Sequence, residues 1–222
     1  MKNGICYVVG AGEDCGIDFR PTKNDLVIAA DAGLRYLEQA GICADLVIGD
    51  FDTLNTVPQH PNVILLNTEK DDTDMLAAIR EGINAGYSVF YLYCGTGGRI
   101  DHTIANLQVL SYLSENYKHG FLFDKGSIIT AITNQKITFD RIPSGYVSVF
   151  SYSPKSSGVC LRGLKYELDN AILTNAFPLG VSNEFIGKES SISVDIGTLI
   201  IVFPREAKEK YNNEKSIDDS RI

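Results

Sequence analysis

The stretch Val89–Leu110, VFYLYCGTGGRIDHTIANLQVL, contains the pattern that decides the fold of its region. It opens with the apolar run Val89–Tyr93, which has the length and composition of a buried strand. The run ends in the glycine-rich segment Cys94–Arg99, and apolar residues then recur at helical spacing from Ile104. A strand, a short loop and a helix in this order are typical of an α/β layer with a mostly parallel sheet.

The same alternation of strand and helix patterns extends to both sides of this stretch. Short apolar runs bounded by Gly, Asp, Asn or Pro predict further strands at Ile5–Val9, Leu26–Ala30, Leu46–Ile48, Val63–Leu66 and Phe121–Phe123. Helical periodicity predicts helices at Ala32–Ala40 and Leu76–Ile83. Asp72 or Thr73 can cap the second of these helices. We therefore expect residues 1–125 to form an α/β domain with a mostly parallel sheet.

The pattern changes near Lys125. From Ser127 to Phe203 the helical periodicity almost vanishes, and about seven short β-rich runs are separated by turn residues. Short strands with turn signals at this spacing predict an all-β sandwich domain over residues 126–204. The segment 205–222 carries five basic and five acidic residues with almost no apolar ones, which predicts a charged tail that is a frayed helix or disordered.

The composition excludes several classes of protein. A formal net charge of -8 disfavours nucleic acid or an anionic membrane as the partner, because both reward clustered Lys and Arg. No apolar run is long enough for a membrane-spanning helix, and the first residues lack the pattern of a secretory signal. Five scattered cysteines without a CxxC pair argue against a disulfide framework and a structural zinc site. We expect a cytoplasmic enzyme.

Acidic motifs gather where the predicted strands end. The residues concerned are Asp31 in VIAAD, Asp50 and Asp52 in LVIGDFD, Asp74 in KDDTD and Asp101 in GGRIDH. In an open α/β sheet ligands bind beyond the carboxyl ends of the strands, so these carboxylates should meet at one edge. Carboxylates left alone repel each other, whereas Mg²⁺ prefers oxygen ligands and bridges them to substrate phosphates. The spacing of Asp50 and Asp52 places both carboxylates on one side of an extended segment.

The glycine-rich segment Cys94–Arg99 is a candidate phosphate site. Its glycines let backbone N–H groups approach phosphate oxygens, and Arg99 adds a planar set of donors. Gly10 and Gly12 follow the first predicted strand and indicate a second loop at the nucleotide edge, with low specificity. His102 suits a general base, a ligand or a structural brace equally well. Together with the carboxylates, the segment predicts metal-assisted phosphoryl transfer.

These motifs, in combination and in order, resemble one family. DAG at Asp31, GDFDT at Asp50–Thr53, KDDTD at Lys70–Asp74 and GGRIDH at Gly97–His102 are similar to the motifs of thiamine pyrophosphokinases. The resemblance covers most of the chain, since the β-rich region is similar to the thiamine-binding domain of that family. It implies a homodimer with the active site at the subunit interface. It also implies Mg²⁺-dependent transfer of diphosphate from ATP to the thiamine hydroxyl, giving thiamine diphosphate and AMP.

The resemblance also implies roles for individual residues. The catalytic carboxylates would be Asp50, Asp52, Asp74 and Asp101, of which the first three would hold Mg²⁺. The nucleotide would contact Asp31, Gly97, Gly98, Arg99 and Asp101. Thiamine would contact Lys70, Ser182 and Asn183, the last two from the other subunit. The roles of Asp71, Asp72 and His102 stay open.

The chain departs from the family pattern in a few places. DAG stands where DGG or DGA is common, and Thr53 stands where Ser is common. Some members stack thiamine on a tryptophan, and this chain has none. Phe177, Phe185 or a tyrosine would then take that position.

Two other functions use the same motifs. A metal-dependent phosphohydrolase would use the carboxylates with water as the nucleophile. A nucleotide sensor would bind ATP without turnover, although a binding site alone has no need for so many carboxylates. Release of AMP only in the presence of thiamine separates the diphosphotransferase from both.

Overall fold

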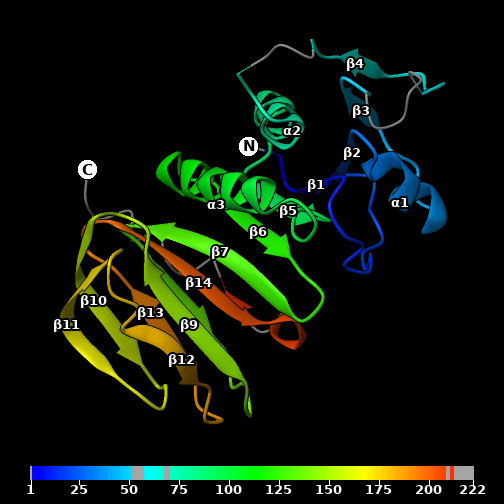
Figure 1. The fold of residues 1–222 in the computed structure, drawn as a ribbon. Coiled ribbons are helices and arrows are strands. Elements are labelled where there is room, and N and C mark those ends of the chain that lie inside the picture. Colours follow the sequence, from blue (N-terminus) through cyan, green and yellow to red (C-terminus); the bar gives the residue numbers. More distant parts are fainter. Residues whose placement is uncertain (1, 52–57, 68–70, 209–210, 213–222) are drawn as a thin grey trace. The chain divides into compact units, whose positions relative to one another are not determined.

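The computed structural model describes residues 2–51, 58–67, 71–208 and 211–212. It divides the chain into two compact units, Met1–Lys125 and Gly126–Ile222. Unit 1 is α/β, and unit 2 is built almost entirely from antiparallel strands (Figure 1). No helix among the described residues is long and apolar enough to cross a membrane.

Unit 1 contains a parallel sheet in which the strands follow the order β6-β5-β1-β2-β3-β4. The strands are β1 Ile5–Val9, β2 Leu26–Ala30, β3 Leu46–Gly49, β4 Val63–Leu65, β5 Val89–Tyr93 and β6 His119–Phe123. All six were predicted from the apolar runs, and the bounds differ by one or two residues. The buried side chains of Phe90, Leu92 and Phe121 belong to the core of this unit.

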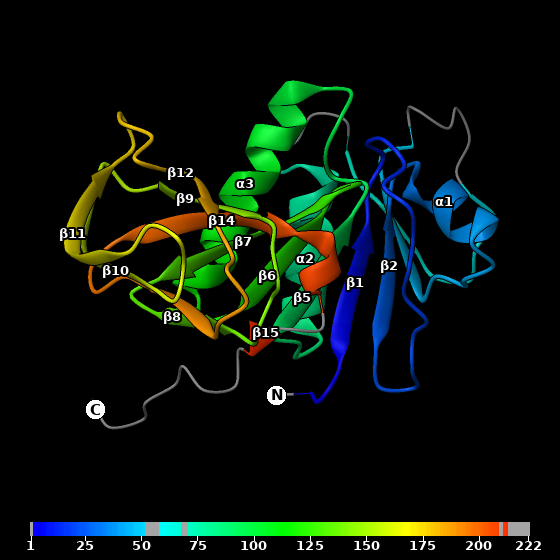
Figure 2. The same cartoon turned by 90° about the horizontal axis from the view of Figure 1, so that it is seen from below.

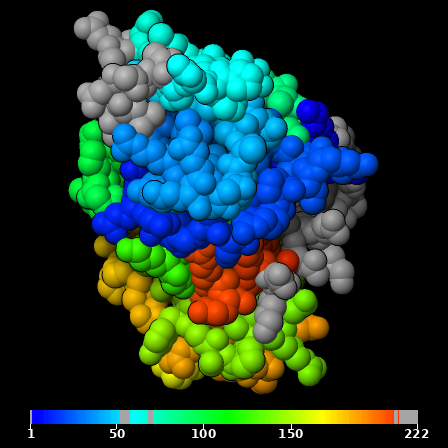
Figure 3. Space-filling view, turned by 90° about the vertical axis from the view of Figure 1, so that its right-hand side faces the viewer, coloured from blue at the N-terminus to red at the C-terminus, as the bar shows by residue number. Residues whose placement is uncertain are grey.

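Three helices connect these strands: α1 Gly33–Gln39, α2 Asp74–Asn84 and α3 Ile100–Glu115. α1 packs against β1 and β2, α2 packs against β1, β2 and β3, and α3 packs against β6. Figure 2 shows the same structure from below, with α3 as a long helix. Figure 3 shows the surface of unit 1 on the side of α1. The cap of α2 is Thr73 rather than Asp72, because the Thr73 hydroxyl accepts a hydrogen bond from the Leu76 amide at 3.2 Å.

The strand order of unit 1 reverses at β1. From β1 the chain adds β2, β3 and β4 on one side, and then returns to place β5 and β6 on the other. The register places Val9 opposite Tyr93 and Ala29, so the residues after β1, β2 and β5 leave the sheet at the same edge. A crevice forms at the carboxyl ends of the strands where such an order reverses. The fold thus assigns the ligand site of unit 1 to the loops after β1, β2 and β5.

Unit 2 has two antiparallel groups of strands. One has the order β12-β9-β14-β7 and the other β11-β10-β13-β8-β15. The strands are β7 Ser127–Thr133, β8 Lys136–Phe139, β9 Tyr146–Ser151, β10 Lys155–Arg162, β11 Leu168–Thr174, β12 Gly180–Glu184, β13 Ser190–Ser193, β14 Thr198–Pro204 and β15 Tyr211–Asn212. The alternating burial of β8, β9 and β10 is that of strands with one face on a core.

Two parts of unit 2 add to what the apolar runs indicate. β12 lies in GVSNE, where the sequence has no run of apolar residues. The turn η1 Arg205–Ala207 and the short strand β15 lie in the segment expected to be a tail, and β15 pairs with β8. The rest of that segment lies outside the described residues, apart from Lys208.

Candidate active site

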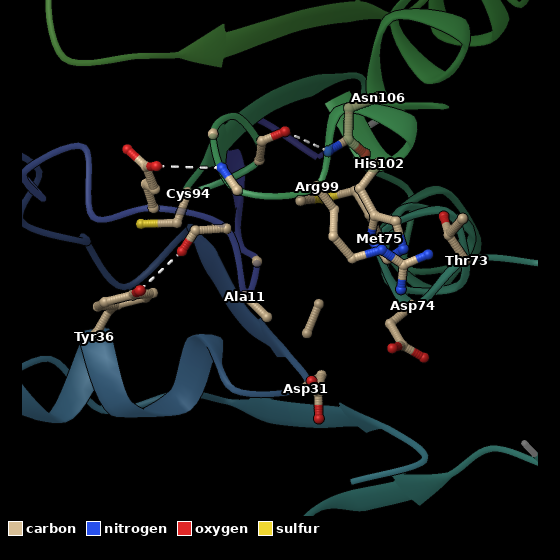
Figure 4. A pocket seen from close by; sticks show the side chains of 17 residues that line it. Ala11, Asp31, Tyr36, Thr73, Asp74, Met75, Cys94, Arg99, His102 and Asn106 are labelled. Atoms are coloured by element: carbon tan, nitrogen blue, oxygen red, sulfur yellow. Dashed lines mark hydrogen bonds between the residues drawn. The ribbon is translucent and has the colours of Figure 1, made fainter. Parts of the chain in front are cut away.

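A pocket of about 460 Å³ opens at the edge of unit 1 where β1, β2 and β5 end. Its lining comes from the loops after these strands, from α1, and from the first turns of α2 and α3. The residues that line it are Gly10, Ala11, Gly12, Glu13, Ala30, Asp31, Tyr36, Thr73, Asp74, Met75, Cys94, Gly95, Gly97, Gly98, Arg99, His102 and Asn106. Figure 4 shows Tyr36 on one wall and Thr73, Asp74 and His102 on the opposite wall.

Asp31 is the buried carboxylate of this pocket. Asp31 has a backbone φ of 50°, in the left-handed region, and is 6% exposed. The Asp31 amide donates to the Ile48 carbonyl at 2.8 Å, which fixes the turn after β2. The Oδ1 atom is buried and has no hydrogen-bond partner within the described part of the chain. A buried carboxylate oxygen without a partner is costly, so this oxygen is held ready for a ligand with a donor or a positive charge.

The glycine of the DAG motif has a packing role. A Cβ atom on Gly33 would lie 1.9 Å from the Val9 carbonyl oxygen, so only glycine allows α1 to begin so close to the end of β1. Tyr36, one turn into α1, then donates its hydroxyl to the Gly12 carbonyl at 2.8 Å. Burial raises the pKa of the Tyr36 phenol, so the hydroxyl stays protonated and keeps donating.

The glycine-rich loop after β5 is held open by left-handed residues. Cys94, Gly97 and Gly98 have φ values of 52°, 76° and 60°. The Gly12 amide donates to the Cys94 carbonyl at 2.7 Å, and the Glu13 amide donates to the Thr96 carbonyl at 2.9 Å. These bonds join the loop after β1 to the loop after β5, so the two loops form one continuous rim of the pocket.

Two buried side chains brace this loop from behind. Asn106 of α3 donates its amide to the Gly95 carbonyl at 2.6 Å, and the Thr96 hydroxyl donates to Asp124 Oδ1 at 2.6 Å. The Cys94 thiol lies 3.8 Å from the Cys15 thiol, and that contact, followed by burial, raises the pKa of Cys94. The loop is therefore fixed by side chains that lie far from it in sequence.

Arg99 and Asp101 form an ion pair at the start of α3. Arg99 Nε lies 3.2 Å from Asp101 Oδ1, and an Arg99 terminal nitrogen lies 2.6 Å from Oδ2. The hydrogen bond from Arg99 holds the pKa of Asp101 below its usual value. Arg99 lines the pocket, whereas Asp101 is exposed and is not among the described lining residues. The guanidinium is thus paired at the rim, in a bidentate geometry that phosphate oxygens also use.

Two family models match successive parts of the chain. The model of the "Thiamin pyrophosphokinase, catalytic domain" matches residues 21–121, and that of the "Thiamin pyrophosphokinase, vitamin B1 binding domain" matches residues 134–199. The chain belongs to the thiamine pyrophosphokinase family. The match of both domain models in order covers most of the chain, and it indicates that the protein is a diphosphotransferase.

Relatives and solved structures give the same result. The thiamine pyrophosphokinase of Bacillus subtilis (strain 168) is 28% identical over 188 residues, which cover 81% of this chain and 87% of the relative. A crystal structure of thiamine pyrophosphokinase from Bacillus subtilis matches with a TM-score of 0.78 and 26% identity, covering 91% of this chain and 99% of that chain. One from Geobacillus thermodenitrificans matches with a TM-score of 0.78 and 25% identity, covering 90% and 97%.

The pocket of this thiamine pyrophosphokinase family member collects part of the residue set predicted from the sequence. Asp31, Asp74, Gly97, Gly98 and Arg99 line it together. Asp50 follows β3 and is half-buried, outside the described lining. Asp52 and Lys70 lie outside the described residues. Among the described residues, which do not include Asp52, no group of three or more His, Cys, Asp or Glu side chains is placed to hold a metal ion.

The KDDTD motif ends where α2 begins. Asp74 begins the helix and lines the pocket, and the Thr73 cap orients this turn. Asp72, whose role the sequence left open, pairs with Arg80 one and a half turns into α2. Asp72 therefore links the segment before the helix to the helix itself, while Asp74 lines the pocket.

Two of the residues predicted to contact thiamine, Ser182 and Asn183, lie on β12 of unit 2. Ser182 is exposed, with a φ of 57°, and its amide donates to Ser148 Oγ at 3.1 Å. Asn183 is buried, and its side chain accepts from the Tyr166 amide at 2.9 Å and donates to the Tyr166 carbonyl at 2.6 Å. Asn183 therefore braces the turn that presents Tyr166, whose own side chain is exposed.

Of the two phenylalanines considered for thiamine stacking, one is buried and the other is exposed. Phe185 is buried, with its ring centroid 5.3 Å from that of Phe139, and belongs to the core of unit 2. Phe177 is 66% exposed.

The motifs do not mark Glu13, Tyr36 and Asn106, which line the pocket, or Asp124, which braces the loop. Asn106 lies on α3 two turns after Arg99, the residue that precedes this helix, and that spacing could have indicated it. No sequence pattern marks Glu13, because its contacts come from residues about 85 and 112 positions away.

Proposed function

We propose that this protein transfers the terminal diphosphate of ATP to the hydroxyl group of thiamine, with Mg²⁺ as the metal. The hydroxyl oxygen forms a bond to the β-phosphorus, the bond from that phosphorus to the bridging oxygen of the α-phosphate breaks, and AMP leaves. The hydroxyl loses its proton, and thiamine diphosphate is the other product. The observation that carries this proposal is the pocket in which Asp31, Asp74, the glycine-rich loop and Arg99 meet.

The donor set of the pocket suits a hard divalent cation. Asp31 has a buried oxygen without a partner among the described residues, and Asp74 lies in the same pocket. We assign Asp50, Asp52 and Asp74 to the magnesium ion, with Asp101 as a further catalytic carboxylate. The metal, when bound, neutralises the charge that develops on the transferred phosphates. Gly97, Gly98 and Arg99 bind phosphate oxygens, and Asp31 binds the nucleotide.

The matched vitamin B1 binding domain supports thiamine as the acceptor. Ser182 is exposed on β12 and contacts thiamine, whereas Asn183 holds Tyr166 and the neighbouring backbone in place. We also assign Lys70, which lies outside the described residues, to substrate binding.

The surface of unit 2 supports a proposed homodimer. Phe177, Leu179 and Val181 alternate along the edge strand β12 and the segment before it, and they are 66%, 52% and 45% exposed. Apolar side chains along an unpaired strand edge favour association with another chain. We propose that two copies of this chain associate here and that each active site takes residues from both subunits.

A coupled assay tests the reaction. Purified protein is incubated with ATP and Mg²⁺, and AMP and thiamine diphosphate are measured with and without thiamine. The proposal expects equal amounts of both products, and only when thiamine is present. AMP or ADP released without thiamine would establish a phosphohydrolase instead, and ATP binding without any product would establish a sensor.

Mixing two inactive variants tests the shared site. Asp74→Asn damages unit 1, and Ser182→Tyr fills the surface of β12 in unit 2. If each site combines both subunits, refolding the two variants together in equal amounts restores about a quarter of the wild-type activity, because half of the dimers have one intact site. Sites contained within one chain would give no recovery.

A further inference from the structure

The side chain of Glu13 accepts a hydrogen bond from a backbone amide of the candidate phosphate loop. Glu13 Oε1 accepts a hydrogen bond from the Gly98 amide at 3.2 Å, and Glu13 Oε2 lies 3.3 Å from Lys125 Nζ. The stem of Glu13 lies against Gly97, where a Cβ atom would be only 2.6 Å from it. One carboxylate thus takes an N–H group and an ammonium group, which are the partners that a phosphate oxygen takes.

The backbone keeps this carboxylate beside the loop. The Glu13 amide donates to the Thr96 carbonyl and the Gly12 amide donates to the Cys94 carbonyl, so the Cα atom of Glu13 is fixed whatever its side chain does. The side chain itself is free to leave, because those of Glu13 and Lys125 are 58% and 67% exposed. An exposed ion pair of this kind contributes little stability and is exchanged readily for another partner.

We propose that Glu13 is an internal competitor of the nucleotide phosphates, holding the Gly98 amide until a phosphate displaces it. This inference rests on the proposed function, in which Gly98 binds a phosphate. When the phosphate binds, the Gly98 amide changes partner, and the carboxylate of Glu13 moves away from the incoming negative charge. Lys125 then pairs with the phosphate. When AMP and product leave, Glu13 returns, which weakens the binding of both and speeds their release.

A purely structural role for Glu13 makes the opposite prediction. If the carboxylate serves to brace the loop, removing it loosens Gly98 and weakens phosphate binding. Glu13→Gln retains an oxygen that can accept from the Gly98 amide but has no charge, whereas Glu13→Ala retains neither. The two variants therefore separate competition from bracing.

The experiment measures binding by isothermal titration calorimetry, with the full chain and inorganic tripolyphosphate as the probe, and repeats it with AMP. Competition predicts that both variants bind each probe more tightly than wild type, by roughly three- to five-fold, the size expected for the loss of an exposed ionic contact. Glu38→Gln, which makes the same charge change on the exposed face of α1, is the control and should bind as wild type does. Equal or weaker binding in both Glu13 variants overturns the inference.

Turnover provides the second measurement. Competition predicts that the Glu13 variants are inhibited by AMP at lower concentrations than wild type and have a lower KM for ATP. If Glu13 is a brace, its removal would raise both the AMP concentration needed for inhibition and the KM for ATP. Wild-type protein that makes no thiamine diphosphate would refute the proposed function, while the tripolyphosphate titrations would still decide the role of Glu13.

Discussion

Replacing Asp31 with Asn should stabilise the protein while impairing its activity. Asp31 is 6% exposed, and its Oδ1 atom has no partner in the described structure. An unsatisfied buried polar group costs about 1–3 kcal/mol, and more when it is charged. Asn removes the charge and tolerates the φ of 50° nearly as well as Asp does, so the backbone does not change. We expect the free energy of unfolding to rise by about 1 kcal/mol in the absence of ligand.

The same substitution at Asp25 should have the opposite effect. Asp25 Oδ1 accepts from the Ile5 amide at 2.8 Å. Asp25 Oδ2 accepts from the Thr22 amide at 2.7 Å and from the Thr22 hydroxyl at 2.9 Å. Asn would turn one of these acceptors into a donor that faces other donors. Because hydrogen bonds to charged groups contribute about 1.5–3 kcal/mol, we expect Asp25→Asn to lower the free energy of unfolding by about 2 kcal/mol.

Urea unfolding gives the comparison directly. The two aspartates lie in the same unit, so circular dichroism follows the same unfolding transition in both variants. The urea concentration at the midpoint should change, while the dependence of the free energy of unfolding on urea concentration stays the same. Mg²⁺ with ATP should raise the midpoint of the wild type and raise that of Asp31→Asn less, since ligand binding to the native state stabilises it. If Asp31→Asn lowers the midpoint as Asp25→Asn does, the carboxylate of Asp31 has a structural partner and is not reserved for a ligand.

Three further outcomes follow from single contacts. Thr73→Ala removes the cap of α2 and should cost about 1 kcal/mol in urea unfolding, with a fall in kcat/KM because Asp74 begins the same turn, while Thr73→Ser should preserve both. Cys43 is exposed, whereas Cys94 is buried with a raised pKa, so a thiol reagent should label Cys43 in the native protein and Cys94 only after unfolding. Burial lowers the pKa of His119 below its ordinary value of about 6.5. As the pH falls below 6.5, His119 is therefore protonated in the unfolded chain before it is protonated in the folded protein, and the free energy of unfolding decreases. His119→Gln should lose this part of the pH dependence of the urea midpoint.

Most strands of unit 1 could be predicted because their side chains are buried on both faces, whereas β4 was found from its apolar run although Leu65 is exposed. Each then appears as a continuous apolar run with a polar or glycine boundary, and the run Val89–Tyr93 followed by Cys94–Arg99 is such a case. β12 Gly180–Glu184 could not be found in this way. It is an edge strand with a buried glycine at one end, and its pairing with β9 has an irregular register.

The site was harder to predict because contacts between distant residues decide which side chain faces the ligand. Of the acidic residues expected to meet at one edge of the sheet, Asp31 and Asp74 line the same pocket. Whether a carboxylate is free or paired is not encoded in its motif. Asp101 is paired by Arg99 two residues earlier, and Asp72 is paired by Arg80 eight residues later.

Under the proposed function, the ion pairs at the rim explain why a chain with a net charge of -8 would need a divalent cation to bind a triphosphate. Arg99 is paired with Asp101 and Lys125 with Glu13, so neither cation is idle before the nucleotide arrives. A phosphate that takes these cations sets two carboxylates free beside its own negative charge, and that repulsion opposes binding. A divalent cation removes the opposition because it accepts carboxylate and phosphate oxygens together. We therefore expect Mg²⁺ to strengthen ATP binding in calorimetry, and the gain to shrink in Glu13→Gln, where one of the two carboxylates is absent.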